Sequence, residues 1–386
     1  MQTYMFRSPN LILFGAGTVA QASAQVRRLG GSRVLIVTDA GIVRTGLLGP
    51  FQAQLESAGL HVTVYDGVLP DPRVRNVEEA EAAGRAAGCD LVIGFGGGSA
   101  MDAAKGTALV LGLGGSIRDY YGVEQVPARG VPSIMIPTTS GSGSEASTAI
   151  VLLDEVSGIK RVANATMLLA DVAIIDPVLT LSVPPGVTAD TGVDALIHAI
   201  EAYTASQGAS PVSDALALEA IRLVGRHLRP AFADGRNLEA RTGMAYAATI
   251  AGIAFTAAGL GAIHAMAYSF AEEHHATHGR SNAVLAPHVM AFNLPANFEK
   301  FARIAAELGE PVEGCSPSVA AGKAVSAVRQ LLADLNISDR LRDYGVLESV
   351  LDNLAIQAYT NGTRLLPNNA RQLTQEDACR IYRAAW

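Results

Sequence analysis

Apolar runs alternate with helical patterns along the first half of the chain. Short apolar runs predict strands, and segments with apolar residues three or four positions apart predict helices between them. Such alternation is typical of a parallel sheet covered by helices, which is the fold class we expect here. Two further runs, 148–153 and 159–163, predict a hairpin added to that sheet. The other expected strands are 11–14, 33–38, 61–65, 91–95, 133–136 and 172–175, and the expected helices are 18–29, 46–58, 76–87 and 100–110.

The pattern changes after Pro184-Pro185, where strand runs disappear and long Ala/Leu-rich helical segments begin. We therefore expect an α/β domain over residues 1–183 and an all-helical domain over 184–386. Residues 242–271 carry no formal charge and exceed the ~20 residues that cross a bilayer. Because small residues dominate there and His264 interrupts the run, two buried helices are the better interpretation. The expected helices of this half are 190–203, 212–228, 238–255, 319–335, 347–359 and 374–385.

Composition narrows the function classes. Of the 386 residues, 49% are hydrophobic and 17% charged, which excludes disorder over most of the chain. The net charge is −7 and no Lys/Arg run stands out, so we expect no nucleic-acid partner. Three scattered cysteines form no CxxC pair, and the first ten residues lack the apolar core of a signal peptide. We therefore expect a cytoplasmic protein that is not bound to a membrane.

Glycine-rich loops are candidates for binding the phosphates of a nucleotide. Residues 15–20 fit the pattern GxGxxA, and Asp39 follows the next strand near the ~20-residue spacing of dinucleotide sites. A second cluster, 96–99, follows a strongly apolar strand and begins a helix, whose free N–H groups favour an anion. We favour this second loop, although Asp102 could equally cap that helix. A third loop, 137–145, is dense in hydroxyls and glycine and could also bind a cofactor.

A cluster of histidines suggests a metal site in the second half. Asp194 and His198 lie four residues apart on one predicted helix face, and His264 and His278 could complete a set of one carboxylate and three imidazoles. Such ligands suit Fe²⁺ or Zn²⁺. A lone histidine in an apolar helix is more often a core residue, and Asp194 could instead mark a helix start. A metal here would polarise an alcohol oxygen, while a nicotinamide cofactor in the first domain would exchange a hydride with the substrate carbon.

The sequence resembles the iron-containing (group III) alcohol dehydrogenases over essentially its whole length. The matching segments are GFGGGSAMDAAK at 94–105, IPTTSGSGSE at 136–145, TGVDALIHAIEAY at 191–203 and HAMAYSFAEEHHATHGRSNAVLAPHVMAFN at 264–293. The resemblance implies the dehydroquinate synthase-like fold and hydride transfer between NAD(H) and a small alcohol or aldehyde. It also implies a metal, Fe²⁺ first and Zn²⁺ as the alternative, held by Asp194, His198, His264 and His278.

The resemblance further implies a set of cofactor-binding residues. It argues against the 15–20 loop as the phosphate-binding loop, because that segment is not the pyrophosphate loop in this family. Asp39 would bond the adenosine ribose and favour NAD over NADP. The other implied contacts are Gly97, Gly98, Ser99 and Asp102 at the pyrophosphate, Thr138, Thr139, Ser142 and Lys160 along the cofactor, and Leu181 near the adenine.

Two departures from the family pattern concern the proton path. Many members carry a histidine four residues after the third ligand, where this chain has Tyr268, and the usual proline before the fourth ligand is Thr277. We expect His275 to pass the proton to solvent and Tyr268 to orient the substrate hydroxyl, although water could replace His275. Phe255 matches a position that lines the substrate pocket.

Related proteins leave other functions open. Glycerol dehydrogenase, with three zinc ligands, and dehydroquinate synthase, a lyase, share the expected fold, and maleylacetate reductase lacks the full ligand set. An inactive NAD-binding protein is a further alternative, against which the intact four-residue set argues. We expect a homodimer or higher homo-oligomer.

Overall fold

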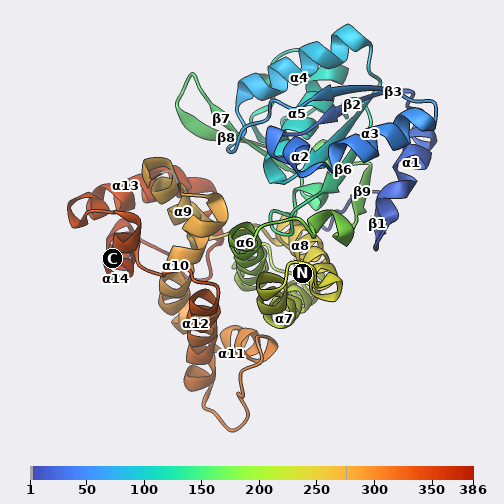
Figure 1. Cartoon of the computed structure of the whole chain (residues 1–386). Coiled ribbons are helices and arrows are strands. Elements are labelled where there is room, and N and C mark those ends of the chain that lie inside the picture. The colour runs from blue at the N-terminus through green and yellow to red at the C-terminus, as the bar shows by residue number, and fades with distance from the viewer. Residues whose placement is uncertain (1–2, 275) are drawn as a thin grey trace. The chain divides into compact units, whose positions relative to one another are not determined.

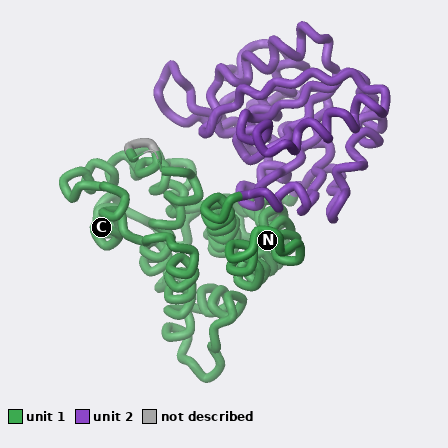
Figure 2. Tube along the Cα trace, viewed as in Figure 1, with its two compact units in different colours: residues 1–6, 184–386 green, residues 7–183 purple. Residues whose placement is uncertain are grey.

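The computed structural model describes residues 3–274 and 276–386. The described chain divides into two compact units, shown in purple and green in Figure 2. The α/β unit runs from Arg7 to Val183. The helical unit comprises Pro184–Trp386, together with the residues up to Phe6. The change between the units therefore falls at the Pro184-Pro185 pair.

A parallel sheet forms the centre of the α/β unit. Within the described residues it has six strands in the order β1-β9-β6-β4-β2-β3, and all neighbouring strands in it are parallel. All six residues of β4 are buried, because helices cover both faces of the sheet. The strands are β1 (Leu11–Phe14), β2 (Arg33–Val37), β3 (His61–Tyr65), β4 (Leu91–Gly96), β6 (Ser133–Pro137) and β9 (Val172–Ile175).

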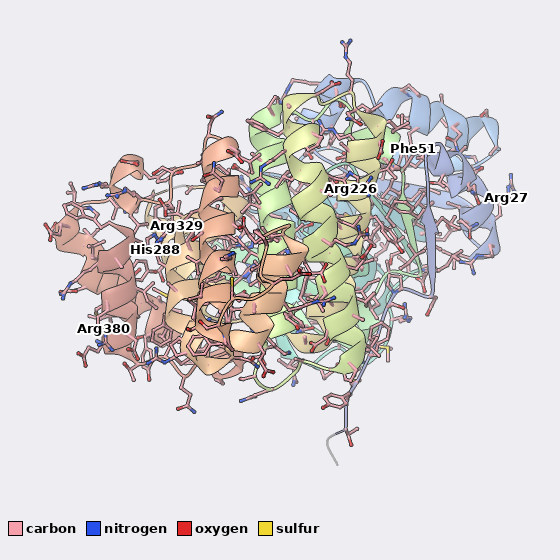
Figure 3. The ribbon with its side chains drawn as sticks, turned by 90° about the horizontal axis from the view of Figure 1, so that it is seen from below. Arg27, Phe51, Arg226, His288, Arg329 and Arg380 are labelled. Atoms are coloured by element: carbon pink, nitrogen blue, oxygen red, sulfur yellow. The ribbon has the colours of Figure 1, made fainter. Side chains whose placement is uncertain are left out.

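Helices cover both faces of the sheet (Figure 1). Alternate residues of β2, β4 and β6 belong to two different apolar clusters, one on each face. Ile36 and Phe95 pack with α1 and α3. Phe51 of α3, labelled in Figure 3, stacks on Phe95 with ring centroids 4.6 Å apart. Leu35 and Val92 pack with α4 and α5 on the other face. The predicted helix-covered parallel sheet is confirmed. The helices are α1 (Ala22–Arg28), α2 (Ala40–Thr45), α3 (Leu48–Ser57), α4 (Val74–Ala87) and α5 (Gly98–Leu113).

The predicted hairpin exists, but its expected place in the main sheet is wrong. Strands β7 (Ala149–Asp154) and β8 (Ile159–Asn164) pair with each other, and β8 pairs with β5 (Gly122–Val123) in a separate sheet (Figure 1). Alternate residues of β7 are buried, and Ile150 and Leu152 pack in a cluster with Val74 and Val77 of α4. Burial of this apolar face places the hairpin against α4 and not at an edge of the main sheet.

The helical unit has one continuous apolar core, to which each of its α-helices contributes buried residues. Helix α6 is buried on all sides from Gly192 to Thr204. It packs against α7, α8 and α10. The predicted all-helical second half is confirmed. Its helices are α6 (Pro185–Thr204), α7 (Pro211–Ala233), α8 (Leu238–Ala258), α9 (Ala262–His274), α10 (His278–Asn293), α11 (Phe298–Glu307), α12 (Pro317–Asp334), α13 (Leu351–Asn361) and α14 (Gln375–Ala385).

The uncharged stretch 242–271 falls on α8 and α9. Among the described residues, no single helix is long and apolar enough to cross a membrane. Helix α8 and residues Ala262–Ala271 meet the criterion only as a pair, and that pair is bent by 108°. Most of their residues are buried, and Ala251, Met266 and Phe270 belong to the apolar core of the helical unit. The structure therefore shows the two buried helices that the sequence indicates.

Candidate functional site

Helix α6 carries the first two candidate metal ligands into the core. It begins at Pro185, a residue type suited to the first helical position because it needs no N–H partner there. Asp194 consequently lies in the helix interior, and its alternative interpretation as a helix-start residue is wrong. Asp194 and His198 are each only 4% exposed. A buried carboxylate and imidazole need polar partners, and both find them in this cluster.

Four candidate ligands converge within the helical unit. Asp194, His198, His264 and His278 each offer one atom, and these atoms all lie within 4.8 Å of one another. Asp194 Oδ1 is 3.9 Å from Nε2 of both His264 and His278. The His198 and His264 rings stack with centroids 4.7 Å apart. Three nitrogens and one oxygen in such a space match the donor set and number of a transition-metal site.

The charges of the cluster are complementary. Burial alone would raise the pKa of Asp194, but the neighbouring His198, His278 and His264 and a hydrogen bond from Asn282 hold that pKa below its usual value. Asn282, four residues after His278, places its amide nitrogen 2.9 Å from Asp194 Oδ1 and 3.1 Å from His264 Nε2. The same nitrogen is 3.3 Å from His278 Nε2. Asn282 therefore contacts three of the four candidate ligands.

Helix α10 is held against α6 at the point where His278 begins it. Thr277 caps the helix, and its hydroxyl donates to Asp190 Oδ2 at 2.8 Å. Arg280 donates to the other oxygen of Asp190 at 2.7 Å. A Cβ on Gly279 would lie 2.2 Å from the Asp190 carbonyl oxygen, so only glycine permits this approach. Thr277, at the position of the usual proline in the family pattern, thus caps the helix and adds a bond to α6 that proline cannot make.

Two aromatic residues flank the imidazoles. Phe255 of α8 packs on the ring of His198, with centroids 4.6 Å apart. Tyr268 of α9 stacks on His278, with centroids 5.6 Å apart and planes 19° from parallel. Both residues are partly buried. His274 lies against Phe270 instead, at 5.6 Å, and His275 lies outside the described residues.

The glycine cluster after β4 lies at the carboxyl end of the parallel sheet. Strands β2, β4 and β6 are neighbours, so the residues that follow them meet at one edge, where open α/β sheets bind ligands. Asp39 Oδ2 lies 3.4 Å from the Cβ position of Gly96. A Cβ on Gly98 would lie 2.8 Å from Ser142 Oγ. The second and third loops therefore share one narrow space, and Asp39 borders it.

Several polar groups at this edge are suited to a ligand. No described side chain caps α5, whose N-terminal N–H groups can bind a phosphate. Thr138 is 1% exposed, and its hydroxyl has no hydrogen-bond partner among the described residues. The buried Ser140 hydroxyl also has no hydrogen-bond partner among the described residues. A buried unpaired hydroxyl is costly, which fits a place that a cofactor completes.

Asp102 does not cap α5, so that alternative is wrong. Its carboxylate accepts from the Ser144 hydroxyl at 2.5 Å and from Val151 N at 2.9 Å, tying α5 to the third loop and β7. Lys105, only 3% exposed, donates to Ser144 O at 3.1 Å and lies 3.3 Å from Asp102 Oδ1. Burial lowers the pKa of Lys105, against the opposing effect of Asp102.

The backbone N–H groups of the first glycine loop, residues 15–20, already donate to a carboxylate of the protein. Asp176 is 1% exposed and accepts from Gly17 N at 3.0 Å and from Val19 N at 3.1 Å. These are the N–H groups that a phosphate would need. The carboxylate of Asp176 would also repel a phosphate, so this loop is a structural turn.

Comparison with known proteins agrees with this architecture. The family model "Iron-containing alcohol dehydrogenase" matches residues 9–177, and "Fe-containing alcohol dehydrogenase family, C-terminal" matches residues 188–386. Together they span most of the chain. The chain belongs to the iron-containing alcohol dehydrogenase family. Each of the two family models matches one half of this family member. The family resemblance that the sequence indicates is confirmed.

Individual relatives cover nearly the full length. The chain is 42% identical to long-chain-alcohol dehydrogenase 1 of Geobacillus thermodenitrificans, over 98% of this chain and 95% of that protein. It is 38% identical to NAD-dependent methanol dehydrogenase of Bacillus methanolicus, over 98% and 99%. The solved structure of a 1,3-propanediol oxidoreductase superposes with a TM-score of 0.97 at 38% identity, over 100% of both chains. The family is one of alcohol oxidoreductases, which confirms the predicted enzyme class.

Three buried polar residues of these two candidate sites were not predicted from the sequence. They are Lys105 beside the glycine loop, Asn282 among the candidate ligands and Glu201 beside His264. Each had a signal in the sequence. Lys105 is the one charge in an otherwise apolar helix after Asp102, while Glu201 and Asn282 share a helix face with predicted ligands. Of the remaining predicted residues, Lys160 pairs with Asp71 at 2.6 Å, and Leu181 follows the turn at Pro177–Thr180.

Proposed function

We propose that this alcohol dehydrogenase holds a catalytic metal through Asp194, His198, His264 and His278. The observation that carries the proposal is the convergence of these four donors, drawn from three helices, within 4.8 Å of one another in a buried site. Fe²⁺ is the first choice because the family is iron-containing, and Zn²⁺ is the alternative because it accepts the same donors. When bound, the metal supplies a Lewis acid that lowers the pKa of an alcohol hydroxyl.

We further propose NAD(H) as the redox partner, bound by the α/β unit, so that residues 1–183 form the cofactor domain and 184–386 the metal and substrate domain. One relative is named as NAD-dependent. The N-terminus of α5 would bind the pyrophosphate with Gly97, Gly98 and Ser99, and the unpaired Thr138 hydroxyl would donate to the cofactor. Asp102 would act by holding this loop in place.

Cofactor choice would depend on Asp39. Its carboxylate accepts from Ile42 N through one oxygen and borders the glycine loop with the other. A carboxylate there can accept from ribose hydroxyls and repels a 2′-phosphate, which favours NAD(H) over NADP(H). Thr139, Ser142, Lys160 and Leu181 complete the proposed set of cofactor contacts.

The substrate is a small alcohol or aldehyde. Phe255 and Tyr268 stack on two of the proposed ligands, so they would form an apolar and a hydroxyl-bearing wall beside the metal. Tyr268 would orient the substrate hydroxyl, and His275 would pass its proton to solvent. A histidine suits that task because its ordinary pKa lies near 6.5, whereas that of tyrosine lies near 10.

Cellular location and assembly complete the proposal. Cys89, Cys315 and Cys379 carry free thiols, which is typical of a reducing compartment and supports a cytoplasmic enzyme. A homodimer or a higher homo-oligomer is proposed, and the mass of the purified protein in solution tests it.

The test compares His264→Ala with His288→Ala. Both residues are buried histidines of the helical unit, but His288 bonds to the Asp339 carbonyl, away from the metal cluster. His264→Ala should lose bound metal and alcohol oxidation together and still bind NADH, measured by nucleotide fluorescence. His288→Ala should keep its metal. Full metal content in His264→Ala would contradict the four-ligand assignment, and a panel of short alcohols and aldehydes with the unmodified enzyme would identify the substrate.

A further inference from the structure

Glu201 makes a buried contact with one of the proposed metal ligands. It follows Asp194 and His198 on α6 at helical spacing, so all three side chains leave the same face of the helix. Its Oε2 lies 2.6 Å from His264 Nδ1. The Glu201 side chain is 4% exposed and that of His264 is not exposed at all. This contact therefore lies on the side of the imidazole opposite to Nε2, which faces Asp194.

The second oxygen of Glu201 is engaged at the start of α9. Oε1 accepts from Ile263 N at 2.7 Å, and Asn369 Oδ1 accepts from the adjacent Ala262 N at 3.2 Å. A Cβ on Gly261 would lie 3.2 Å from Oε1, so the turn before α9 closes tightly around the carboxylate. The N-terminus of a helix presents donors and a partial positive charge, which favours an ionised carboxylate there.

This arrangement specifies where the imidazole carries its proton. An ionised carboxylate only accepts hydrogen bonds, so Nδ1 of His264 must be the donor in the 2.6 Å contact. A neutral imidazole has one N–H, and Nε2 is then left with its lone pair. Nε2 is the nitrogen that faces Asp194 Oδ1 and the Asn282 amide, so the lone pair points into the cluster.

We propose that Glu201 is a positioning residue that holds His264 in the tautomer with its proton on Nδ1, so that Nε2 is free to bind the metal. The inference rests on the proposed metal site and deepens it. Carboxylates that accept from a ligating histidine fix its ring and raise its basicity, and their loss costs metal affinity. The competing role for Glu201 is purely structural, as a cap of α9.

Glu201→Gln separates the two roles. The N–H of Ile263 can only donate, so the oxygen of the Gln amide should face it and accept that hydrogen bond. The cap of α9 is therefore kept. The amide NH₂ then faces His264 Nδ1, which must become the acceptor. The imidazole proton moves to Nε2, where a metal must displace it, so metal binding is weakened. If Glu201 were only a cap of α9, Glu201→Gln would leave metal binding unchanged.

The experiment loads the full-length chain, stripped of metal by a chelator, with Co²⁺ and follows the visible absorption bands that report its ligand geometry. Glu201→Gln should bind Co²⁺ about 10–100-fold more weakly than the unmodified chain and give an altered spectrum. The thermal midpoint of the metal-free variant should stay close to that of the metal-free parent. Asp377→Asn is the matched control, since Asp377 is a buried carboxylate that accepts from Thr374 N at the start of α14 in the same unit. It should bind Co²⁺ as the parent does.

Unchanged Co²⁺ affinity and spectrum in Glu201→Gln would overturn the inference and leave the metal site standing. Failure of the unmodified chain to bind metal, or full binding by His264→Ala, would instead overturn the proposed site. If Glu201→Gln does not fold, the metal-free parent decides the question through the ring nitrogen shifts of ¹⁵N-labelled histidine, with the His264 signals identified by their loss in His264→Ala. A proton on Nδ1 supports the inference, and a proton on Nε2 contradicts it.

Discussion

Replacing Lys105 by Met should destabilise the α/β unit and weaken cofactor binding together. The ammonium group donates to the carbonyl oxygens of Ser144 and Ala149 and to the Ser147 hydroxyl, and it lies 3.3 Å from Asp102. Methionine fills a similar volume but leaves the Asp102 carboxylate without its counter-charge. Removing one partner of a buried ion pair costs about 3–5 kcal/mol. For a unit of roughly 150–250 residues, this corresponds to a fall of about 6–20 °C in the thermal midpoint.

The burial of Lys105 argues in the opposite direction, which makes the prediction informative. Burial lowers the pKa of this lysine, so a neutral side chain would relieve a desolvation cost. We expect the loss to exceed the relief, because three hydrogen-bond acceptors and a carboxylate lose their partner at once. The segment around Ser144 should also loosen, and because it packs against Gly98, the KM for NAD should rise more than kcat falls.

Lys160→Met is the matched control for stability. Its ion-pair partner Asp71 is 53% exposed, and exposed pairs contribute roughly 0–1 kcal/mol. Both variants are compared by calorimetry of the full chain without nucleotide, following the transition of the α/β unit. A thermal midpoint for Lys105→Met no lower than that of Lys160→Met would refute the reasoning.

Further predictions concern the cofactor, the proton path and pH. Asp39→Gly should bring kcat/KM with NADP closer to that with NAD, and equal efficiency with both cofactors in the unmodified enzyme would contradict the role of Asp39. His275→Ala should slow alcohol oxidation and alter the acid limb of its pH profile, whereas Tyr268→Phe should mainly raise the substrate KM; an unchanged profile in His275→Ala would favour water as the proton carrier. Burial lowers the pKa of His288, which bonds to the Asp339 carbonyl near Arg329 (Figure 3), so the unfolded chain takes up a proton first as pH falls below about 6.5. Stability should therefore fall on acidification through that window, and His288→Gln should show a smaller fall in chemical denaturation.

The parallel sheet was predictable because its inner strands β2, β4, β6 and β9 are almost entirely buried, on both faces. Segments such as 91–95 are continuous apolar runs bounded by turns, and strands 11–14, 61–65 and 172–175 have the predicted bounds. Short elements were harder. Helix α2 has only six residues, and its Ile42 is only partly buried against an apolar cluster, so the segment is too short to show a helical period and was not predicted. The β7–β8 hairpin was found from local alternation, but its sheet depends on contacts with α4 that no local pattern contains.

The candidate ligands were predictable for a different reason. Asp194 and His198 share a helix face, which the sequence shows directly. His264 and His278 were candidates from the cluster of histidines, and the family resemblance implied the same two. Contacts between distant segments could not be read in the same way. Glu201 and His264 are 63 residues apart in the sequence. Only the fold shows that the Glu201 carboxylate contacts Nδ1 of His264 and not a nitrogen of another of the eight histidines.

Helix α6 shows why these polar contacts matter for the assembly of the site. It is buried on all sides yet carries Asp194, His198 and Glu201, and each of them needs a compensating partner. The partners come from the starts of two other helices: His264 lies in the first turn of α9, and His278 begins α10. Glu201 fixes the first of these starts through Ile263 N, and Asp190 fixes the second through Thr277 and Arg280. The same helix therefore supplies two candidate ligands and anchors the helices that bring the other two, so a substitution that shifts α6 should disturb all four donors together.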